Sequence, residues 1–301
     1  MRWISALILL SALLGDSALG YAKSRALMAW NRARDIIAIS LQAQIRLHDG
    51  RTQKLIAVLE NESALTALAW QPEGDWLATG DADGRLCLWS AVALTRQCSL
   101  GAGVSVRALA WHPKDGLIAS ASEDQVRLWR VESLTLRRAW SAEGIVTALA
   151  WHGDRLAVGG AVRGTYEQGF LALYDESGAV QARYAAEMRP PLNLQSLQGD
   201  QLGVSTPFDV FRWRVSEQRY LPLYLPLREG ESVRLAAWRA DAAQALVVLD
   251  QRLLCFAESA PHGERGLEKP IVAFSWNAEA QRVALLSEDG ALQVIAAEPC
   301  R

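Results

Sequence analysis

The chain is dominated by an internal repeat of about 40 residues. Apolar strings end in tryptophan at six regular positions: RALMAW, LTALAW, VRALAW, VTALAW, VRLAAW and VAFSW, ending at Trp30, Trp70, Trp111, Trp151, Trp238 and Trp276. The spacings are 40, 41, 40, 87 and 38 residues, and the interval of 87 hides a seventh copy in which Leu197 replaces tryptophan. Such a repeat predicts one structural unit per copy, stabilised by packing against its neighbours.

Each copy has the same internal order. The tryptophan is followed by a polar turn such as QPEGD, a second apolar run, an acidic turn such as DADG, a third run and a fourth short run. Runs of four to seven residues between Gly, Asp, Pro and Ser turns are typical of strands and too short for helices. Four antiparallel strands at this period predict a propeller blade. We therefore expect an all-β, seven-bladed β-propeller over residues 24–301, with four-stranded antiparallel blades.

The second and third copies carry a family resemblance. The stretches ALAWQPEGDWLATGDADGRLCLWS and ALAWHPKDGLIASASEDQVRLWRV resemble the repeats of the WD-repeat β-propeller family. The Gly-His pair that often precedes the first strand in that family is missing from every copy. The resemblance implies a partial structural network in which threonine or serine, aspartate and tryptophan bond to one another within a blade. Its members here would be Thr79, Asp83 and Trp89 in the second copy and Ser120, Asp124 and Trp129 in the third.

The N-terminal segment has the pattern of a secretory signal. In residues 1–22 one arginine precedes an apolar stretch from Trp3 to Leu14, and small residues follow at Gly20 and Ala22. About a dozen apolar residues are too few to span a bilayer core. We therefore expect a signal peptide over residues 1–22 and a periplasmic or secreted protein.

Closure of the ring conflicts with this expectation. The seventh copy stops six residues after Ile295, which leaves its blade without a fourth strand. In the WD-repeat family the N-terminus usually supplies that strand, which here would fall at about residues 14–19, inside the signal. The alternative is a cytoplasmic protein whose N-terminal segment closes the propeller; we favour cleavage, which would leave the last blade incomplete.

The cysteines suggest a disulfide. Cys87 and Cys98 lie symmetrically about the turn between the third and fourth strands of one blade. Opposed residues on antiparallel strands have Cα atoms about 4.5–5.5 Å apart, which a disulfide tolerates. Cys255 and Cys300 are a weaker candidate pair. An exported protein could hold such bonds.

Composition and motifs argue against several functions. With 31 Lys and Arg against 33 Asp and Glu, the chain lacks the basic excess typical of nucleic-acid binding. His112 and His152 follow the repeat tryptophan without further metal ligands, so we interpret them as turn residues. The sequence has no nucleophile elbow, P-loop, dinucleotide-binding or haem-attachment motif. We expect no catalysis, no cofactor and no metal.

The expected function is binding of a protein or peptide. Five polar residues lie four positions before the repeat tryptophan or its equivalent and would line the channel mouth: Thr66, Arg107, Thr147, Asn193 and Arg234. The fourth copy has an insertion, GGAVRGTYEQGF, whose Arg163 and Tyr166 have the character of interface anchors. The hypothesis is an interaction scaffold that docks a partner with an acidic or mixed polar patch. The alternative is an enzyme or cofactor-binding propeller that takes a small ligand in its channel.

Overall fold

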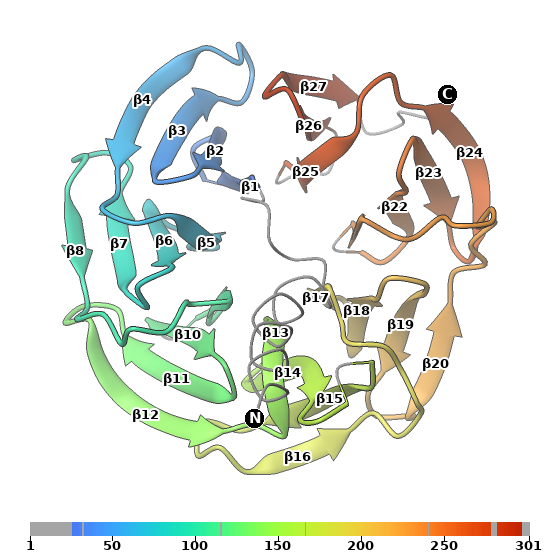
Figure 1. The fold of residues 1–301 in the computed structure, drawn as a ribbon, viewed down its shortest axis with the longest axis horizontal. Helices are drawn as coiled ribbons and strands as arrows, with labels where there is room; N and C mark the ends of the chain where they lie inside the picture. The colour runs from blue at the N-terminus through green and yellow to red at the C-terminus, as the bar shows by residue number, and fades with distance from the viewer. Residues whose placement is uncertain are drawn as a thin grey trace, which may run out of the picture.

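The repeat folds into seven antiparallel sheets arranged as a ring (Figure 1). The computed structural model describes residues 26–31, 33–114, 116–165, 167–239, 241–277 and 282–296. Within these residues six sheets have four strands and the seventh has three, and strands that are consecutive in the chain are neighbours in each sheet. The predicted all-β, seven-bladed propeller is therefore confirmed.

The blades follow one another along the chain. Blades 1 to 4 consist of β1 (Leu27–Asn31), β2 (Ile36–Leu41), β3 (Gln44–Asp49), β4 (Leu55–Glu60); β5 (Leu65–Trp70), β6 (Trp76–Asp81), β7 (Leu86–Ser90), β8 (Arg96–Cys98); β9 (Ala108–Trp111), β10 (Leu117–Ser122), β11 (Gln125–Arg130), β12 (Thr135–Ser141); and β13 (Gly144–His152), β14 (Arg155–Val162), β15 (Gly169–Tyr174), β16 (Val180–Arg183). Blades 5 to 7 consist of β17 (Asn193–Leu197), β18 (Gln201–Ser205), β19 (Val210–Arg214), β20 (Arg219–Pro222); β21 (Leu235–Trp238), β22 (Gln244–Val248), β23 (Arg252–Ala257), β24 (Ala260–Gly266); and β25 (Ile271–Trp276), β26 (Arg282–Ser287), β27 (Leu292–Ala296).

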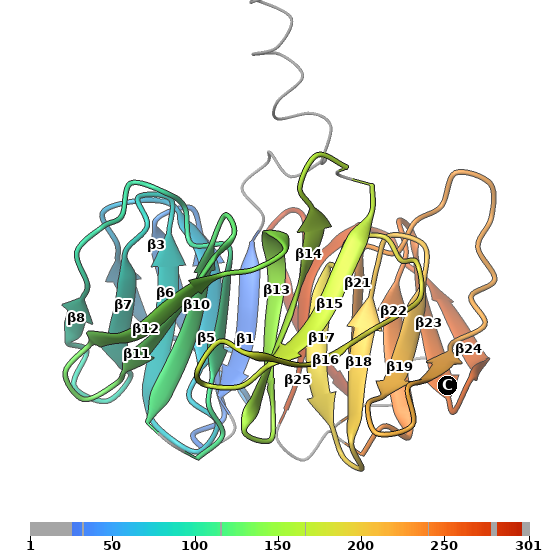
Figure 2. The same ribbon diagram turned by 90° about the horizontal axis from the view of Figure 1, so that it is seen from below.

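The strand order defines two faces of the ring. The first strand of each blade lies nearest the axis and the fourth lies at the rim (Figure 1). Figure 2 shows the first strands starting at the face that also carries the loop between β14 and β15. We call this the upper face; it holds the turns between second and third strands and the connections between blades. The lower face holds the turns that follow the repeat tryptophans.

The core lies between blades rather than within a central layer. One apolar cluster joins blades 3 and 4 and includes Val126, Leu128, Trp151 and Leu156. Because both faces of a blade pack against a neighbour, most strand residues are apolar on both sides, as in buried sheets. The ring therefore depends on seven similar interfaces.

Three of the repeat tryptophans form hydrogen bonds to the blade that precedes their own. The indole Nε1 of Trp70 donates to the carbonyl of Ala29 at 3.0 Å, that of Trp111 to Ala69 at 2.8 Å, and that of Trp151 to Ala110 at 3.1 Å. In each case the acceptor is the residue that precedes the tryptophan of the blade before. The Ala-Trp pair thus supplies an acceptor to one neighbour and a donor to the other.

Blade 5 departs from this pattern on both sides: Leu197 has no indole that could donate to blade 4, and towards blade 6 an amide bonds where the Trp238 indole does not. Leu197 occupies the tryptophan position, and the Gln195 side chain bridges to blade 6 by donating to the Trp238 carbonyl at 2.7 Å and accepting from the Trp238 N–H at 2.9 Å. The Trp238 ring packs where a Cβ on Gly203 would come within 2.6 Å of it, so a glycine is needed there. The Trp238 indole nitrogen is buried without a hydrogen-bond partner.

Blades 7 and 1 meet directly. Trp30, Ile37 and Ile39 of blade 1 pack with Ala273, Ala284 and Leu286 of blade 7. Arg282 donates to the Asp35 carboxylate at 2.9 Å and to the Gly50 carbonyl at 2.8 Å, and its guanidinium lies 5.2 Å from the Trp30 ring centre. In the described residues blade 7 has three strands; the candidate closing strand at residues 14–19 and the signal peptide at residues 1–22 lie outside them. No helix in the described ranges is long and apolar enough to cross a membrane.

The interblade bond gives a testable prediction. Replacement of Trp111 by Phe keeps an aromatic ring but leaves the Ala69 carbonyl without its donor, so we expect unfolding free energy to fall by about 1–3 kcal/mol from this bond alone. The matched control is Trp238→Phe, which removes a similar area from an indole that has no hydrogen-bond partner. Urea denaturation of the two variants isolates the bond; equal losses would show that it contributes nothing.

Candidate interaction face

Three of the five residues predicted to line the channel mouth are bonded to the next blade. Thr66 donates through Oγ1 to the Val106 carbonyl at 2.5 Å, and Thr147 donates to the Pro191 carbonyl at 2.6 Å. Asn193 donates more weakly to the Ala236 carbonyl at 3.4 Å. These three side chains therefore help to join blades, and their role in partner binding stays a prediction.

The two arginines of the series remain exposed on the upper face. Arg107 lies 3.5 Å from the Glu123 carboxylate, and Arg234 lies 2.5 Å from the Asp250 carboxylate. Each acidic partner belongs to the turn between second and third strands of the same blade. The guanidinium groups are held in position by these pairs, with 38% and 60% of their side chains exposed.

The insertion of blade 4 reaches back to blade 3. Arg163 forms an ion pair at 2.6 Å with Asp124, although 72% of its side chain is exposed. Glu167 in the same loop pairs with Arg189 at 2.8 Å. The loop is thereby fixed at both ends on the upper face, where Figure 2 shows it rising above the ring. Tyr166, the other predicted anchor, lies outside the described residues.

The WD-type network exists only in part. Trp89 donates to Thr79 at 2.9 Å, and Trp129 donates to Ser120 at 2.8 Å. The aspartates do not join these bonds: Asp83 is exposed, and Asp124 pairs instead with Arg163. The expected roles of both aspartates in the network are therefore wrong.

A different aspartate holds the turn of blade 2. Asp81 is 1% exposed and accepts from the backbone N–H groups of Asp83 and Arg85 at 3.0 and 2.9 Å. It also accepts from the Asn61 amide, which belongs to the preceding connection, at 3.3 Å. Sequence reasoning missed Asp81 because only its burial distinguishes it from the other acidic residue of the DADG turn.

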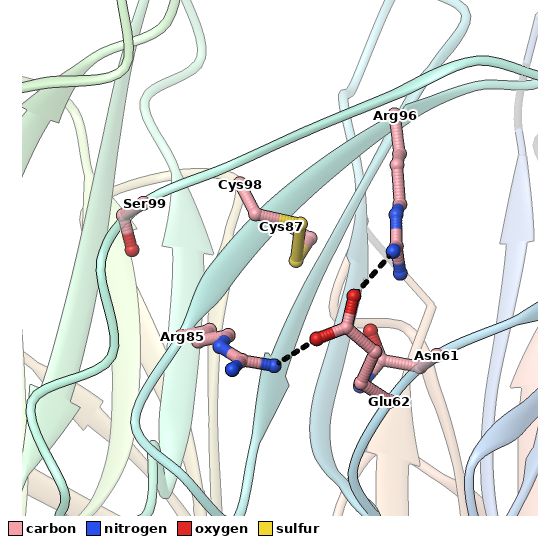
Figure 3. Close-up of a pocket in the computed structure, with 7 residues that line it drawn as sticks. All are labelled: Asn61, Glu62, Arg85, Cys87, Arg96, Cys98 and Ser99. Carbon is pink, nitrogen blue, oxygen red and sulfur yellow. Dashed lines mark hydrogen bonds and ion pairs between the residues drawn. A yellow bond between two sulfur atoms is a disulfide. The ribbon is translucent and has the colours of Figure 1, made fainter.

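A small polar pocket opens beside this turn at the rim of blade 2 (Figure 3). Its volume is about 190 Å³, and Glu62 bridges two arginines across it, Arg85 at 2.7 Å and Arg96 at 2.6 Å. The hydrogen bond from Arg96 and the charge of Arg85 lower the pKa of Glu62. The charges of Glu62, Arg85 and Arg96 in this pocket are therefore paired with one another.

A disulfide lines the same pocket. Cys87 and Cys98 are bonded, with Cα atoms 4.1 Å apart, and their residues pair directly across β7 and β8 (Figure 3). The bond fixes a fourth strand of only three residues to its blade. No cysteine in the described part of the chain is free, and Cys300, the candidate partner of Cys255, lies outside that part.

A buried arginine organises the connection between blades 5 and 6. Arg252 is 5% exposed and bonds to Glu231 at 2.8 Å, to Glu264 at 3.0 Å and to the Pro226 carbonyl at 2.9 Å. The hydrogen bond from Arg252 lowers the pKa of Glu231 more than burial raises it. Arg252 therefore holds the irregular connection between β20 and β21 against blade 6.

His152 joins the lower edges of blades 4 and 5. Its Nδ1 lies 3.2 Å from the Ser196 hydroxyl and its Nε2 lies 3.0 Å from the Asp200 carboxylate. These are the residue types of a hydrolytic triad, but in a triad the serine bonds to Nε2 and the aspartate to Nδ1. Here the arrangement is reversed and the three residues span two blades, so we assign them to interblade positioning. The sequence pattern predicts only a turn role for His152 and does not indicate Ser196 or Asp200.

The regions that the structure describes contain no candidate metal site. No cluster of three or more His, Cys, Asp or Glu side chains there could hold a metal ion.

The comparisons with known proteins agree with this fold. A family model described as WD domain, G-beta repeat, matches residues 53–90 and 96–130, which are the second and third copies. The mitotic checkpoint complex contains a chain of the same fold, with a TM-score of 0.76 and 13% identity over 91% of this chain and 87% of that one. Two of the seven copies thus match WD repeats, and the described residues have the β-propeller fold.

Curated relatives match over about a third of this propeller. The small ribosomal subunit protein RACK1y of Oryza sativa subsp. japonica is 28% identical over 102 residues, which are 34% of this chain and 30% of that protein. The WD repeat and HMG-box DNA-binding protein 1 of Xenopus laevis is 30% identical over 98 residues, 31% of this chain and 9% of that protein. The matches thus span less than a third of either relative.

The Asp200 contacts predict a pH dependence of stability. Burial raises the pKa of Asp200, but hydrogen bonds from His152 and Ser216 outweigh it and lower the pKa from 3.8 to about 2. Its stabilisation is therefore present above pH 3.8 and lost as pH falls towards 2. Since the side chain is partly exposed, we expect a contribution on the order of 1 kcal/mol.

The measurement is chemical denaturation of the wild type and of Asp200→Asn at several pH values. The wild type should lose more stability than the variant between about pH 5 and about pH 2, because only the wild type has this carboxylate to protonate. Asp154→Asn, at an exposed carboxylate of the neighbouring turn, is the control and should behave as the wild type. Parallel curves for the wild type and Asp200→Asn would contradict the assignment.

Proposed function

We propose that this propeller is a non-catalytic scaffold that binds a partner protein or peptide on its upper face. The observation that carries the proposal is the set of exposed arginines that ion pairs hold in place there: Arg107, Arg163 and Arg234. Each keeps a large fraction of its side chain accessible while its direction is fixed. A surface of oriented charges loses little conformational entropy on binding.

The charge pattern indicates the kind of partner. Every one of these arginines faces an acidic residue of its own chain, so the upper face presents alternating charges rather than a single positive field. A partner with an acidic or mixed polar patch can replace or share these pairs. Such charge complementarity governs orientation and specificity more than affinity.

The relatives support a binding role in their own settings. RACK1y is named as a protein of the small ribosomal subunit, and the structural neighbour was solved within a checkpoint complex. Both are therefore constituents of assemblies. The same use of a WD-repeat ring is proposed for this chain.

We also propose that the protein is exported. The support is the signal-like composition of residues 1–22 together with the Cys87–Cys98 disulfide, because disulfides persist mainly in oxidising compartments. N-terminal sequencing of the protein purified from its source should begin after residue 22; a chain that begins at Met1 would contradict export by cleavage.

Charge reversal tests the binding face. The double variant Arg107→Glu and Arg234→Glu should lose partner capture at least about tenfold, since two attractive charges become repulsive. Arg34→Glu is the matched control, because Arg34 forms a similar exposed pair with Asp75 at 2.7 Å on the lower face. Proteins from a source extract would be quantified by mass spectrometry after capture on each variant. The proposal would be contradicted if the double variant captured the same proteins as the wild type, or if Arg34→Glu lost the same proteins as the double variant.

A further inference from the structure

A groove lined by aromatic side chains lies at the outer side of blades 5 and 6. It has a volume of about 430 Å³ and is formed by the turn between β18 and β19, by β20 and by the segment that follows β20. Phe208, Tyr220 and Tyr224 line it, with 55%, 41% and 69% of their surface exposed. Within the described ranges, these are all of the Phe, Tyr and Trp side chains that are exposed. Aromatic side chains are usually buried, and the few that are exposed are usually scattered over the surface. Three exposed rings in one groove therefore mark a binding surface.

The groove is preformed. Tyr220 packs 4.9 Å from the ring of Phe211, and its hydroxyl donates to Asp209 at 2.7 Å. The segment after β20 is fixed by the bond from the Leu223 N–H to the Val210 carbonyl at 2.8 Å. It is fixed again by the bond from the Tyr224 N–H to the Ser259 carbonyl at 2.9 Å. A ligand would therefore meet a Tyr220 ring and a backbone segment that are already in place.

One acidic group accompanies the rings. Asp209 lines the groove, and no ion pair with a cationic side chain is found for it in the part of the chain that the structure describes. Burial, together with the bond to Asp209, raises the pKa of the Tyr220 phenol, so the tyrosine remains the donor. The Asp209 carboxylate thus lines the same groove as the three aromatic rings.

We propose that this groove binds an extended, proline-containing segment of a partner protein through a lysine or arginine side chain. Aromatic faces attract cations, and a neighbouring carboxylate adds to that attraction. Aromatic-lined grooves also accept the polyproline II conformation, which loses little entropy on binding. The length of the lining, which continues from Tyr220 to Leu227, suits an extended chain better than a small ligand.

This groove is a second surface, distinct from the arginines of the upper face. It presents one carboxylate among aromatic and apolar side chains, whereas the upper face presents arginines paired with carboxylates. It therefore selects a basic partner segment where the upper face selects an acidic or mixed one. The two proposals can therefore fail independently.

Fluorescence anisotropy with a labelled peptide tests the groove. The probe is a decapeptide of alternating proline and alanine with one central arginine, titrated with the full chain; the matched probe carries neutral citrulline in place of arginine. We expect the arginine peptide to bind at least about threefold more tightly than the citrulline peptide, because only arginine carries a charge that the aromatic faces and the carboxylate attract. Tyr224→Ala should weaken its binding by about fivefold.

The variants separate charge from shape. Asp209→Asn should remove the preference for arginine over citrulline, while Leu100→Ala, at an apolar residue 94% exposed elsewhere, should change neither affinity. Arg163→Glu on the upper face should also bind the arginine peptide as the wild type does. Equal binding of the two peptides by the wild type, an unchanged preference in Asp209→Asn, or no binding of either peptide would overturn the proposal. A further test uses a peptide in which glycine replaces every proline. If this peptide binds as tightly as the proline peptide and tetramethylammonium displaces it, the groove is a site for small cations, which would also overturn the proposal.

Discussion

The fold depends on the contact between the tryptophan of one blade and the first strand of the blade before it. In blades 2 to 4 the indole fills the space between two sheets and donates to a backbone carbonyl of the preceding blade. A carbonyl on an innermost strand would otherwise be buried without a donor, which is costly. The residue that supplies this carbonyl is an alanine in all three cases. Repetition of this contact every 40 residues or so turns a series of hairpins into a closed ring.

The ring then decides where function can lie. Its interior surfaces are used for blade-to-blade packing, so only the two faces and the rim are available for partners. Some ion pairs of the upper face lie within one blade, as those of Arg107 and Arg234 do. The pair of Arg163 with Asp124 joins blades 3 and 4. At the rim, the connection between blades 5 and 6 is held by buried Arg252 and exposes aromatic rings beside it. Binding surfaces of opposite chemistry thus rest on one rigid frame.

The blade count and strand order could be predicted because they depend on local pattern. Each strand is a short apolar run with its own turns, and Leu197 was recognisable as a degenerate copy from its neighbours alone. The roles of individual polar residues were harder to predict. Thr66 and Thr147 bond to carbonyls 40 and 44 residues away, and no local signal distinguishes such a tie from a free lining residue.

The same limit applies to the sites. Asp81 and Asp83 are two residues apart in one turn, yet only the first is buried. The groove of blades 5 and 6 could not be predicted because its rings come from a turn, a strand and an irregular connection whose arrangement depends on contacts with blade 6. Exposure of an aromatic side chain is a property of that arrangement rather than of the sequence.

Site-specific photo-crosslinking from both faces would test the central functional claim most directly. A photoreactive amino acid placed at Glu167 would sample the upper face, and one placed at Asp154 would sample the lower face, during growth of the source organism. We expect a discrete adduct with one protein from the upper position and none from the lower. Adducts from the lower position alone, or the same adducts from both, would contradict a scaffold that binds through its upper face.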